Sequence, residues 1–328
     1  MPDMLVAGLQ YRYSTIFADL LMDLGLTLLV ATGTSGSVVT VWADGDGLRV
    51  TSDPFPQPRA LAAFEGQLAL GLPAQILGFD WTERRYGDPG RRNAWWWNYP
   101  SRSRVTAESP CTDLTWDKTG LWTLQSQPAR ITVQASNNDT RVFWSHSDTA
   151  SPFARCDGLF SGMAFSGGVP RFLTGFPDSS VSGEGGAATP VPTGFILDIR
   201  EAQALVTGLC SPHSPRVHRR RLWILNSGRG ELAEFDLHVR KLRPLCRFPG
   251  FARGLVCHED YAFVGLSSHP DPGLLANSPL DDMFTSLCCG IAIIHLPTGR
   301  CHGQLEFDAG VQEVLSLELL QTSIPRVR

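Results

Sequence analysis

The sequence lacks the short motifs that identify the best-known enzyme classes. It contains no phosphate-binding loop of the Walker A type, no dinucleotide-binding glycine fingerprint, no Gly-x-Ser-x-Gly elbow and no His-Glu-x-x-His zinc motif. Its 8 cysteines form no Cys-x-x-Cys pair, which is typical of reduced, mostly buried thiols and argues against a cysteine zinc site. We therefore expect no metal and no cofactor.

Charge of either sign is scarce. Charged residues make up 18% of the 328 residues and the formal net charge is -4, so the chain as a whole does not attract nucleic acid or an anionic membrane surface. The apolar run over residues 24–31 is too short to span a bilayer, and Met1-Pro2-Asp3 lacks the basic region of a secretory signal. These absences predict no nucleic-acid partner, no membrane association and, by default, a cytoplasmic location.

Short apolar segments separated by turn residues make up most of the chain. Hydrophobic residues reach 43%, and 32 glycines and 23 prolines punctuate them. The exception is residues 13–25, where Ser14 can cap a helix, Gly25 can end it, and apolar residues recur at helical spacing in between. The pattern predicts a nearly all-β chain with one short accessory helix near the amino terminus.

A degenerate repeat runs through the predicted strands. Each copy has a strand of small and apolar residues, a polar turn, and a second strand centred on an aromatic residue or leucine. The copies start near Arg59, Thr112, Ser161, Arg216 and Arg253, at spacings of 37 to 55 residues that bracket one four-stranded sheet module. We predict a β-propeller of about six blades that forms a single domain over residues 1–328. A two-sheet sandwich is the alternative, but it leaves the repetition unexplained.

The two ends of the chain supply incomplete parts of a blade. The segments 26–31, 37–43 and 48–51 read as strands that supply only part of a blade, and the segment 311–320 near the carboxy terminus reads as an unpaired strand. Pairing the two ends would close the ring and remove two exposed sheet edges. We therefore expect the C-terminal strand to complete the first blade.

Two segments interrupt the repeat. Residues 81–109 and 177–192 read as irregular insertions, and the first contains Trp95-Trp96-Trp97. Three adjacent indoles in an extended segment cannot all point into one core, so a lid, a partner surface and packing beneath the loop all remain open roles for this run.

Three motifs in the carboxy-terminal half carry a family resemblance. They are Pro-His-Ser-Pro-Arg at 212–216, Pro-Gly-Phe-Ala-Arg-Gly-Leu at 249–255 and Cys-Gly-Ile at 289–291. These motifs resemble an uncharacterised bacterial β-propeller family, known as a conserved hypothetical protein and sometimes fused to tetratricopeptide or sulfotransferase domains. The resemblance is strongest from Leu209 to Val314. It implies the propeller fold but no established activity.

The chain also departs from that family. The earlier blades of the family carry histidines in patterns that resemble His-Asp-Ile-Ala-Trp and Cys-His-Leu-Asn-Gly, whereas the matching segments here are 112–116, Thr-Asp-Leu-Thr-Trp, and 159–162, Leu-Phe-Ser-Gly. Only His213 remains as an inner-rim imidazole. If the family site holds a metal, the resemblance implies that this chain is a divergent, metal-free member.

The starts of the repeats should converge in space, because the innermost strands of a propeller line a central channel. The expected set is Arg59, Asp113, Ser161, His213, Ser214, Arg216, Arg253 and Glu313. The arginines are suited to a carboxylate or phosphate, and a histidine can transfer a proton. Alternatively, the same groups hydrogen-bond one another and fill the channel.

Three functions remain open from the sequence. The first is a binding or accessory propeller that holds a small molecule or a peptide at an anion-favouring central site. The second is a metal-independent lyase, isomerase or hydrolase in which His213 is the general acid or base and Asp113 or Glu313 its partner. The third is a scaffold for a protein partner, for which the Trp95 loop is the candidate surface.

Overall fold

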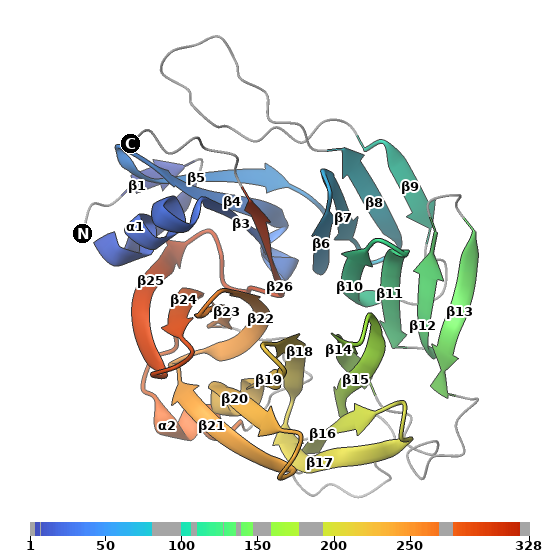
Figure 1. The fold of residues 1–328 in the computed structure, drawn as a ribbon. Helices are drawn as coiled ribbons and strands as arrows, with labels where there is room; N and C mark the ends of the chain where they lie inside the picture. Colours follow the sequence, from blue (N-terminus) through green and yellow to red (C-terminus); the bar gives the residue numbers. More distant parts are fainter. Residues whose placement is uncertain are drawn as a thin grey trace, which may run out of the picture.

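Six antiparallel sheets stand side by side in a ring (Figure 1). The protein is described here from a computed structural model, which defines residues 4–6, 8–80, 100–105, 110–126, 128–135, 139–146, 159–176, 193–268 and 278–321. The first blade contains β26 (Ser316–Gln321), β3 (Leu26–Ala31), β4 (Ser37–Asp44) and β5 (Gly47–Pro54). The second contains β6 (Ala60–Phe64), β7 (Gln67–Gly71), β8 (Gln75–Asp80) and β9 (Arg102–Val105).

The remaining four blades follow in chain order around the ring. The third contains β10 (Cys111–Asp117), β11 (Gly120–Ser126), β12 (Ala129–Gln134) and β13 (Thr140–Ser145). The fourth contains β14 (Leu159–Ser166), β15 (Val169–Phe176), β16 (Thr193–Asp198) and β17 (Gln203–Cys210). The fifth contains β18 (Pro212–His218), β19 (Arg221–Asn226), β20 (Glu231–Asp236) and β21 (Lys241–Arg247). The sixth contains β22 (Phe251–His258), β23 (Tyr261–Ser267), β24 (Gly290–His295) and β25 (Arg300–Ala309). The prediction of a six-bladed propeller is confirmed.

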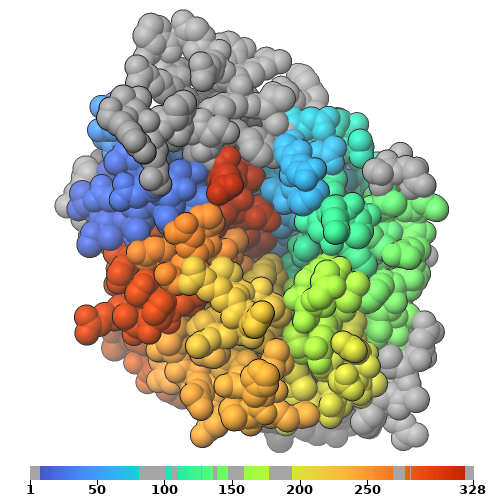
Figure 2. All heavy atoms as spheres, viewed as in Figure 1, coloured from blue at the N-terminus to red at the C-terminus, as the bar shows by residue number. Residues whose placement is uncertain are grey.

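The core lies between neighbouring blades. Every residue of β3 and of β11 is buried, because both faces of an inner sheet position are covered by adjacent sheets. Trp122 of the third blade packs in one cluster with Phe160 and Phe195 of the fourth. The space-filling view shows the blades packed against each other around the ring, so that side chains occupy the gaps seen between the ribbons (Figure 2). Burial between blades therefore sets the position of each inner strand.

The ring closes through β26. This strand pairs antiparallel with β3, with Ser316 opposite Ala31 and Leu320 opposite Thr27. The C-terminal strand thus completes the sheet formed by β3, β4 and β5, as the incomplete strand counts predict. Closure places β26 beside β6 and β22 near the centre (Figure 1).

The helix α1 (Thr15–Leu24) lies within the predicted range. Gly25 ends it in the left-handed conformation, at φ 61 and ψ 44, and its N–H donates to the carbonyls of Leu21 and Met22, as expected. Ser14 stands at the cap position, but its Oγ accepts from the N–H of Gln304 at 3.0 Å instead of capping the helix. The helix is therefore tied to the edge of the sixth blade. No helix among the described residues is long and apolar enough to cross a membrane.

Three outer strands were missed by the sequence interpretation. β1 (Met4–Val6) and β2 (Leu9–Tyr13) extend the sixth blade to 6 strands, because β2 pairs with β25. Residues 102–105, which fall in the predicted irregular insertion 81–109, form β9 against β8. Its residues, Arg-Ser-Arg-Val, do not form an apolar run, since an outer edge strand needs little burial. Residues 81–99, with Trp95-Trp96-Trp97, and residues 177–192 lie outside the described part of the chain.

Candidate functional site

Four inner strands contain a β-bulge near their starts. The pairing register shifts between Cys111 and Asp113 in β10 and between Phe160 and Gly162 in β14. It shifts again between His213 and Arg216 in β18 and between Ala252 and Leu255 in β22. A bulge leaves an extra residue unpaired and redirects the neighbouring side chains. The repeat therefore brings the same local distortion, with polar side chains, to one end of each of these four inner strands.

These strand starts surround a cavity of about 270 Å³. Its lining includes seven of the eight predicted residues: Arg59, Asp113, Ser161, His213, Ser214, Arg216 and Arg253. Glu313 does not line it but forms an ion pair with Arg253. Apolar side chains, among them Phe160 and Phe176, complete the wall. The convergence expected from the repeat is thus present in the structure.

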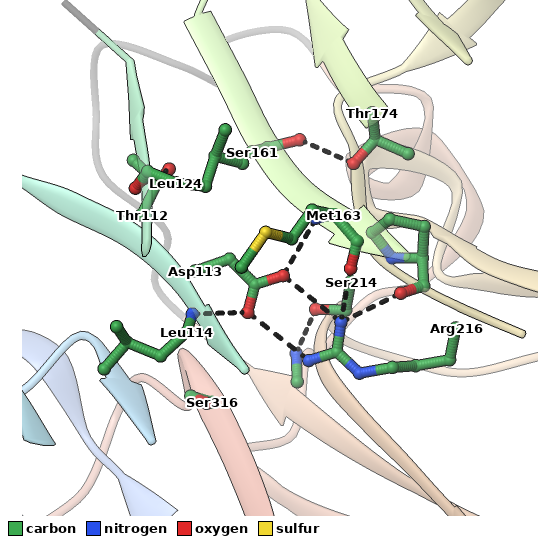
Figure 3. A network of polar contacts seen from close by, with 12 residues as sticks. Thr112, Asp113, Leu114, Leu124, Ser161, Met163, Thr174, Ser214, Arg216 and Ser316 are labelled. Carbon is green, nitrogen blue, oxygen red and sulfur yellow. Dashed lines mark hydrogen bonds and ion pairs between the residues drawn. The ribbon is translucent and has the colours of Figure 1, made fainter. Parts of the chain in front are cut away.

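Asp113 and Arg216 form a two-point ion pair across the ring (Figure 3). The Nη1 and Nη2 atoms of Arg216 lie 3.2 and 3.4 Å from Oδ2 and Oδ1 of Asp113. The backbone N–H groups of Leu114 and Met163 donate to the same carboxylate at 3.0 and 2.9 Å. The Asp113 carboxylate therefore links the third, fourth and fifth blades.

Glu313 has a comparable structural role at the ring closure. Its Oε1 lies 3.4 Å from Nη1 of Arg253, and its Oε2 accepts from the N–H and the hydroxyl of Thr34, both at 3.1 Å. A Cβ on Gly33, whose φ is +54, would lie 2.2 Å from Oε2. The carboxylate fits this turn only because residue 33 has no side chain.

Two hydroxyls on the cavity wall join adjacent blades. Ser161 donates from Oγ to the carbonyl of Pro212 at 2.5 Å and lies 3.1 Å from Oγ1 of Thr174. The Oγ of Ser214 accepts from the N–H of Gly254 at 3.0 Å. For these hydroxyls and for both carboxylates, the geometry is that of groups that hydrogen-bond one another between blades.

His213 is buried, at 5% exposure, and no hydrogen bond joins its ring to Asp113 or Glu313. Its Nδ1 lies 2.8 Å from the carbonyl oxygen of Ser211, and its ring packs 5.8 Å from that of Phe176. Burial, with the nearby positive charge of Arg253, lowers the pKa of His213 to about 3. The imidazole is therefore neutral at physiological pH and has no proton to donate as an imidazolium.

Arg59 differs from the other cavity arginines. Within the described residues it makes no ion pair, whereas the guanidinium groups of Arg216 and Arg253 each face a carboxylate. In the same part of the chain, the Nε atoms of Arg59 and Arg253 are both buried without a hydrogen-bond partner. The positive charges of Arg59, Arg216 and Arg253 thus exceed the negative charges of Asp113 and Glu313 by one.

One functional group near the site was missed by the sequence interpretation. Glu318 of β26 accepts from the N–H groups of Leu319 and Ala63 at 2.9 and 3.3 Å. Burial raises its pKa to about 7, although these N–H groups and the charge of Arg216 act in the opposite direction. Glu318 alternates with apolar neighbours in the closing strand, and only the assumption that β26 is an inner strand could have drawn attention to it.

A larger cavity, of about 710 Å³, lies between the second and third blades. Its lining includes Phe64, Arg104 and Trp116, and it shares no residue with the central cavity. Burial and the neighbouring charge of Arg130 lower the pKa of Arg104. None of the eight predicted residues lies there.

The cysteines and histidines do not assemble a metal centre in the part of the chain that the structure defines. No group of three or more His, Cys, Asp or Glu side chains is placed to hold an ion among those residues. Cys111 lines the central cavity, and its burial together with Asp113 raises the pKa of the thiol far above its usual range. A thiol in that state is a poor nucleophile.

The fold and the cavity define the chain as a six-bladed β-propeller with a central cavity lined by apolar and charged side chains. The chain belongs to the family described as a domain of unknown function, DUF4915, whose model matches residues 15–327. This agrees with the expected membership of an uncharacterised family. No curated protein matches the chain.

Similar solved structures support the fold. One is a nidogen/laminin complex, with 10% identity, a TM-score of 0.55, and coverage of 92% of this chain and 100% of that chain. Another is a protein of unknown function from Bacteroides caccae, with 10% identity, a TM-score of 0.55, and coverage of 91% and 100%. At this identity the likeness concerns the propeller alone.

Proposed function

We propose that this protein binds a small anionic molecule in the central cavity. The observation that carries the proposal is Arg59, a guanidinium in the cavity wall that has no carboxylate partner among the described residues. A cation in a partly buried cavity attracts an anion more strongly than the same cation in water, because the local dielectric is lower. Arg253, on the same wall, would supply a second donor.

The size of the cavity supports a small ligand. A volume of about 270 Å³ lies just below the usual range for small-molecule sites, roughly 300–1,000 Å³, so only a small ligand fits. A peptide would fit only through a terminal group or a single side chain. The mixture of apolar wall and few charged groups is also that of a binding pocket.

The catalytic alternative has weaker support. A general acid or base needs a partner within hydrogen-bond reach and a pKa near the working pH. His213 bonds to a carbonyl, its pKa lies near 3, and Asp113 and Glu313 are each bonded to an arginine. We therefore place the binding function first. The scaffold alternative depends on the Trp95 loop, which lies outside the described residues.

Isothermal titration calorimetry tests the proposal. Propionate, glycerate and inorganic phosphate are titrated into the full chain and into Arg59→Met, with Arg200→Met as the control because the Arg200 side chain is 74% exposed. A charge-assisted hydrogen bond contributes roughly 1.5–3 kcal/mol, so we expect binding of a carboxylate to weaken about 10-fold or more in Arg59→Met only. Equal affinities of the native chain and Arg59→Met, or no binding of any anion, would reject the proposal.

A further inference from the structure

The tautomer of His213 is set by its neighbour. A carbonyl oxygen can only accept a hydrogen bond, so the Nδ1 that lies 2.8 Å from the Ser211 carbonyl carries the ring hydrogen. In a neutral imidazole the other nitrogen then has no hydrogen and is an acceptor. Nε2 has no hydrogen-bond partner among the described residues, and the ring lines the cavity. The cavity wall therefore contains an accessible acceptor that has no donor among the described residues.

The electrostatics keep this acceptor unprotonated. Burial and the charge of Arg253 both disfavour the imidazolium form, and the pKa of His213 near 3 lies well below physiological pH. Nε2 therefore remains an acceptor from pH 5 upward. The arginines on the cavity wall favour an anionic group on the ligand, and the acceptor-only histidine favours a hydrogen-bond donor on the same ligand.

The backbone holds the histidine in a strained segment. Ser211 and Ser214, which flank it closely, have φ values of 49 and 50, and each left-handed residue that is not glycine costs roughly 1 kcal/mol. Neighbouring glycines make room for this segment: a Cβ on Gly194 would lie 2.1 Å from Cδ of Pro212, and one on Gly162 would lie 2.5 Å from Cδ of Pro215. Strain that persists beside a cavity is typical of functional sites.

An anionic group and a neutral hydrogen-bond donor on one molecule define the ligand class. We propose, on the basis of the anion-binding function above, that the ligand is a hydroxycarboxylate whose carboxylate faces Arg59 and Arg253 and whose hydroxyl donates to Nε2 of His213. A hydroxyl is favoured over an ammonium group as the donor, because a second cation beside the arginines is repelled. A monoanion is favoured over a phosphate dianion, because the cavity groups carry one positive charge in excess.

Selectivity should follow from the unpaired acceptor. A bound ligand without a hydroxyl would cover Nε2 without offering it a donor, and sites built around such a hydrogen bond discriminate strongly against the analogue that lacks it. The class thus includes glycolate, glycerate and larger sugar acids, and it excludes the corresponding simple carboxylates.

Matched pairs of ligands test this inference on the native chain. Calorimetry compares glycolate with acetate and glycerate with propionate, at pH 7 and at pH 5.5. We expect the hydroxylated member of each pair to bind at least 10-fold more tightly at both pH values. If both members of each pair bind equally well, the inference is wrong while the proposed anion site stands. If neither member binds, the proposed function and the inference both fail.

Variants separate the two contacts. His213→Phe retains a ring against Phe176 but has no acceptor, so the preference for the hydroxylated member should fall below about 3-fold. Arg59→Met should weaken the binding of both members of a ligand pair to the same extent. His213→Gln, which restores an acceptor, should recover part of the preference and also serves if His213→Phe does not fold. A preference that is unchanged in both His213 variants would overturn the assignment.

Discussion

Arg216 and Asp113 form an ion pair that joins the fifth blade to the third, with the fourth bonded to both of its members. The two side chains are 103 positions apart in sequence, and they meet only because the ring is closed. The pair therefore connects the fold to the cavity, since both residues also line the wall.

Replacement of Asp113 should destabilise the protein more than loss of a surface charge. Asp113→Asn leaves the guanidinium of Arg216 without its counterion in a partly buried position, and we expect a loss of about 3 kcal/mol in the free energy of unfolding. Urea titration measures this change. Adding Arg216→Met should recover part of the loss, because the unpaired charge is then gone.

Asp46→Asn is the matched control for that experiment. Asp46 pairs with Arg49 at 2.9 Å, but its side chain is 84% exposed, so its loss should change stability by less than about 0.5 kcal/mol. A cost of the same size for Asp113→Asn would show that the central pair is not structural.

Glu318 should make stability depend on pH. Its pKa is raised to about 7 in the folded state from an ordinary 4.5, so the folded chain binds this proton more tightly than the unfolded chain. The contribution of the protonated Glu318 to the free energy of unfolding is fully present below pH 4.5 and is lost as the pH rises through 7. Through Glu318, the native chain should lose roughly 2 kcal/mol of its free energy of unfolding between pH 5 and pH 8. Glu318→Gln should not show this loss, and urea unfolding at the two pH values measures the difference.

His213 should act in the opposite direction. Its pKa is lowered to about 3 from an ordinary 6.5, so the unfolded chain takes up the proton first and stability falls as the pH drops below 6.5. At pH 5 this amounts to roughly 2 kcal/mol. Native stability alone mixes the two effects, so the unfolding curves of His213→Gln and Glu318→Gln must be compared with it.

Nuclear magnetic resonance provides an independent check on His213. Long-range proton–nitrogen spectra should show a neutral ring with its hydrogen on Nδ1, unchanged from pH 8 to pH 5. A ring that titrates between pH 6 and pH 7 would contradict both the lowered pKa and the acceptor role of Nε2.

Gly33 should be essential at the ring closure. Gly33→Ala combines a left-handed φ of +54 with a contact of 2.2 Å between the new Cβ and Oε2 of Glu313, so it should displace this carboxylate from Thr34 and Arg253. We expect a loss of about 3 kcal/mol in thermal or urea unfolding.

Gly167→Ala isolates the backbone part of this effect. Gly167 has a similar φ, +68, but nothing lies within 4 Å of the added Cβ, so its replacement should cost only about 1 kcal/mol. Equal costs at the two positions would mean that the Glu313 contact does not matter.

The sequence predicts the convergence of the site better than the roles of its members. Repeat starts and the unpaired strands at both ends are sufficient to place Arg59, Arg253 and His213 around one cavity, because a closed ring leaves no other place for inner strands. The sequence could not predict the structural role of Asp113 and Glu313. That role depends on how close each carboxylate lies to an arginine from another part of the ring.

The remaining omissions have physical causes as well. Outer strands such as β2 and β9 carry a weaker apolar signal because one face of each strand is exposed to solvent. The raised pKa of Glu318 depends on burial by neighbouring blades, and the strain at Ser211 and Ser214 depends on glycines in the adjacent blade. These properties depend on contacts between blades and cannot be predicted from the local sequence.

A crystal structure of the native protein with glycerate would locate the ligand directly. We expect the carboxylate within hydrogen-bond distance of the guanidinium groups of Arg59 and Arg253 and the hydroxyl within about 3 Å of Nε2 of His213. If glycerate binds only in the inter-blade cavity beside Arg104, or if the central cavity stays free of it at a saturating concentration, the hydroxycarboxylate assignment is wrong.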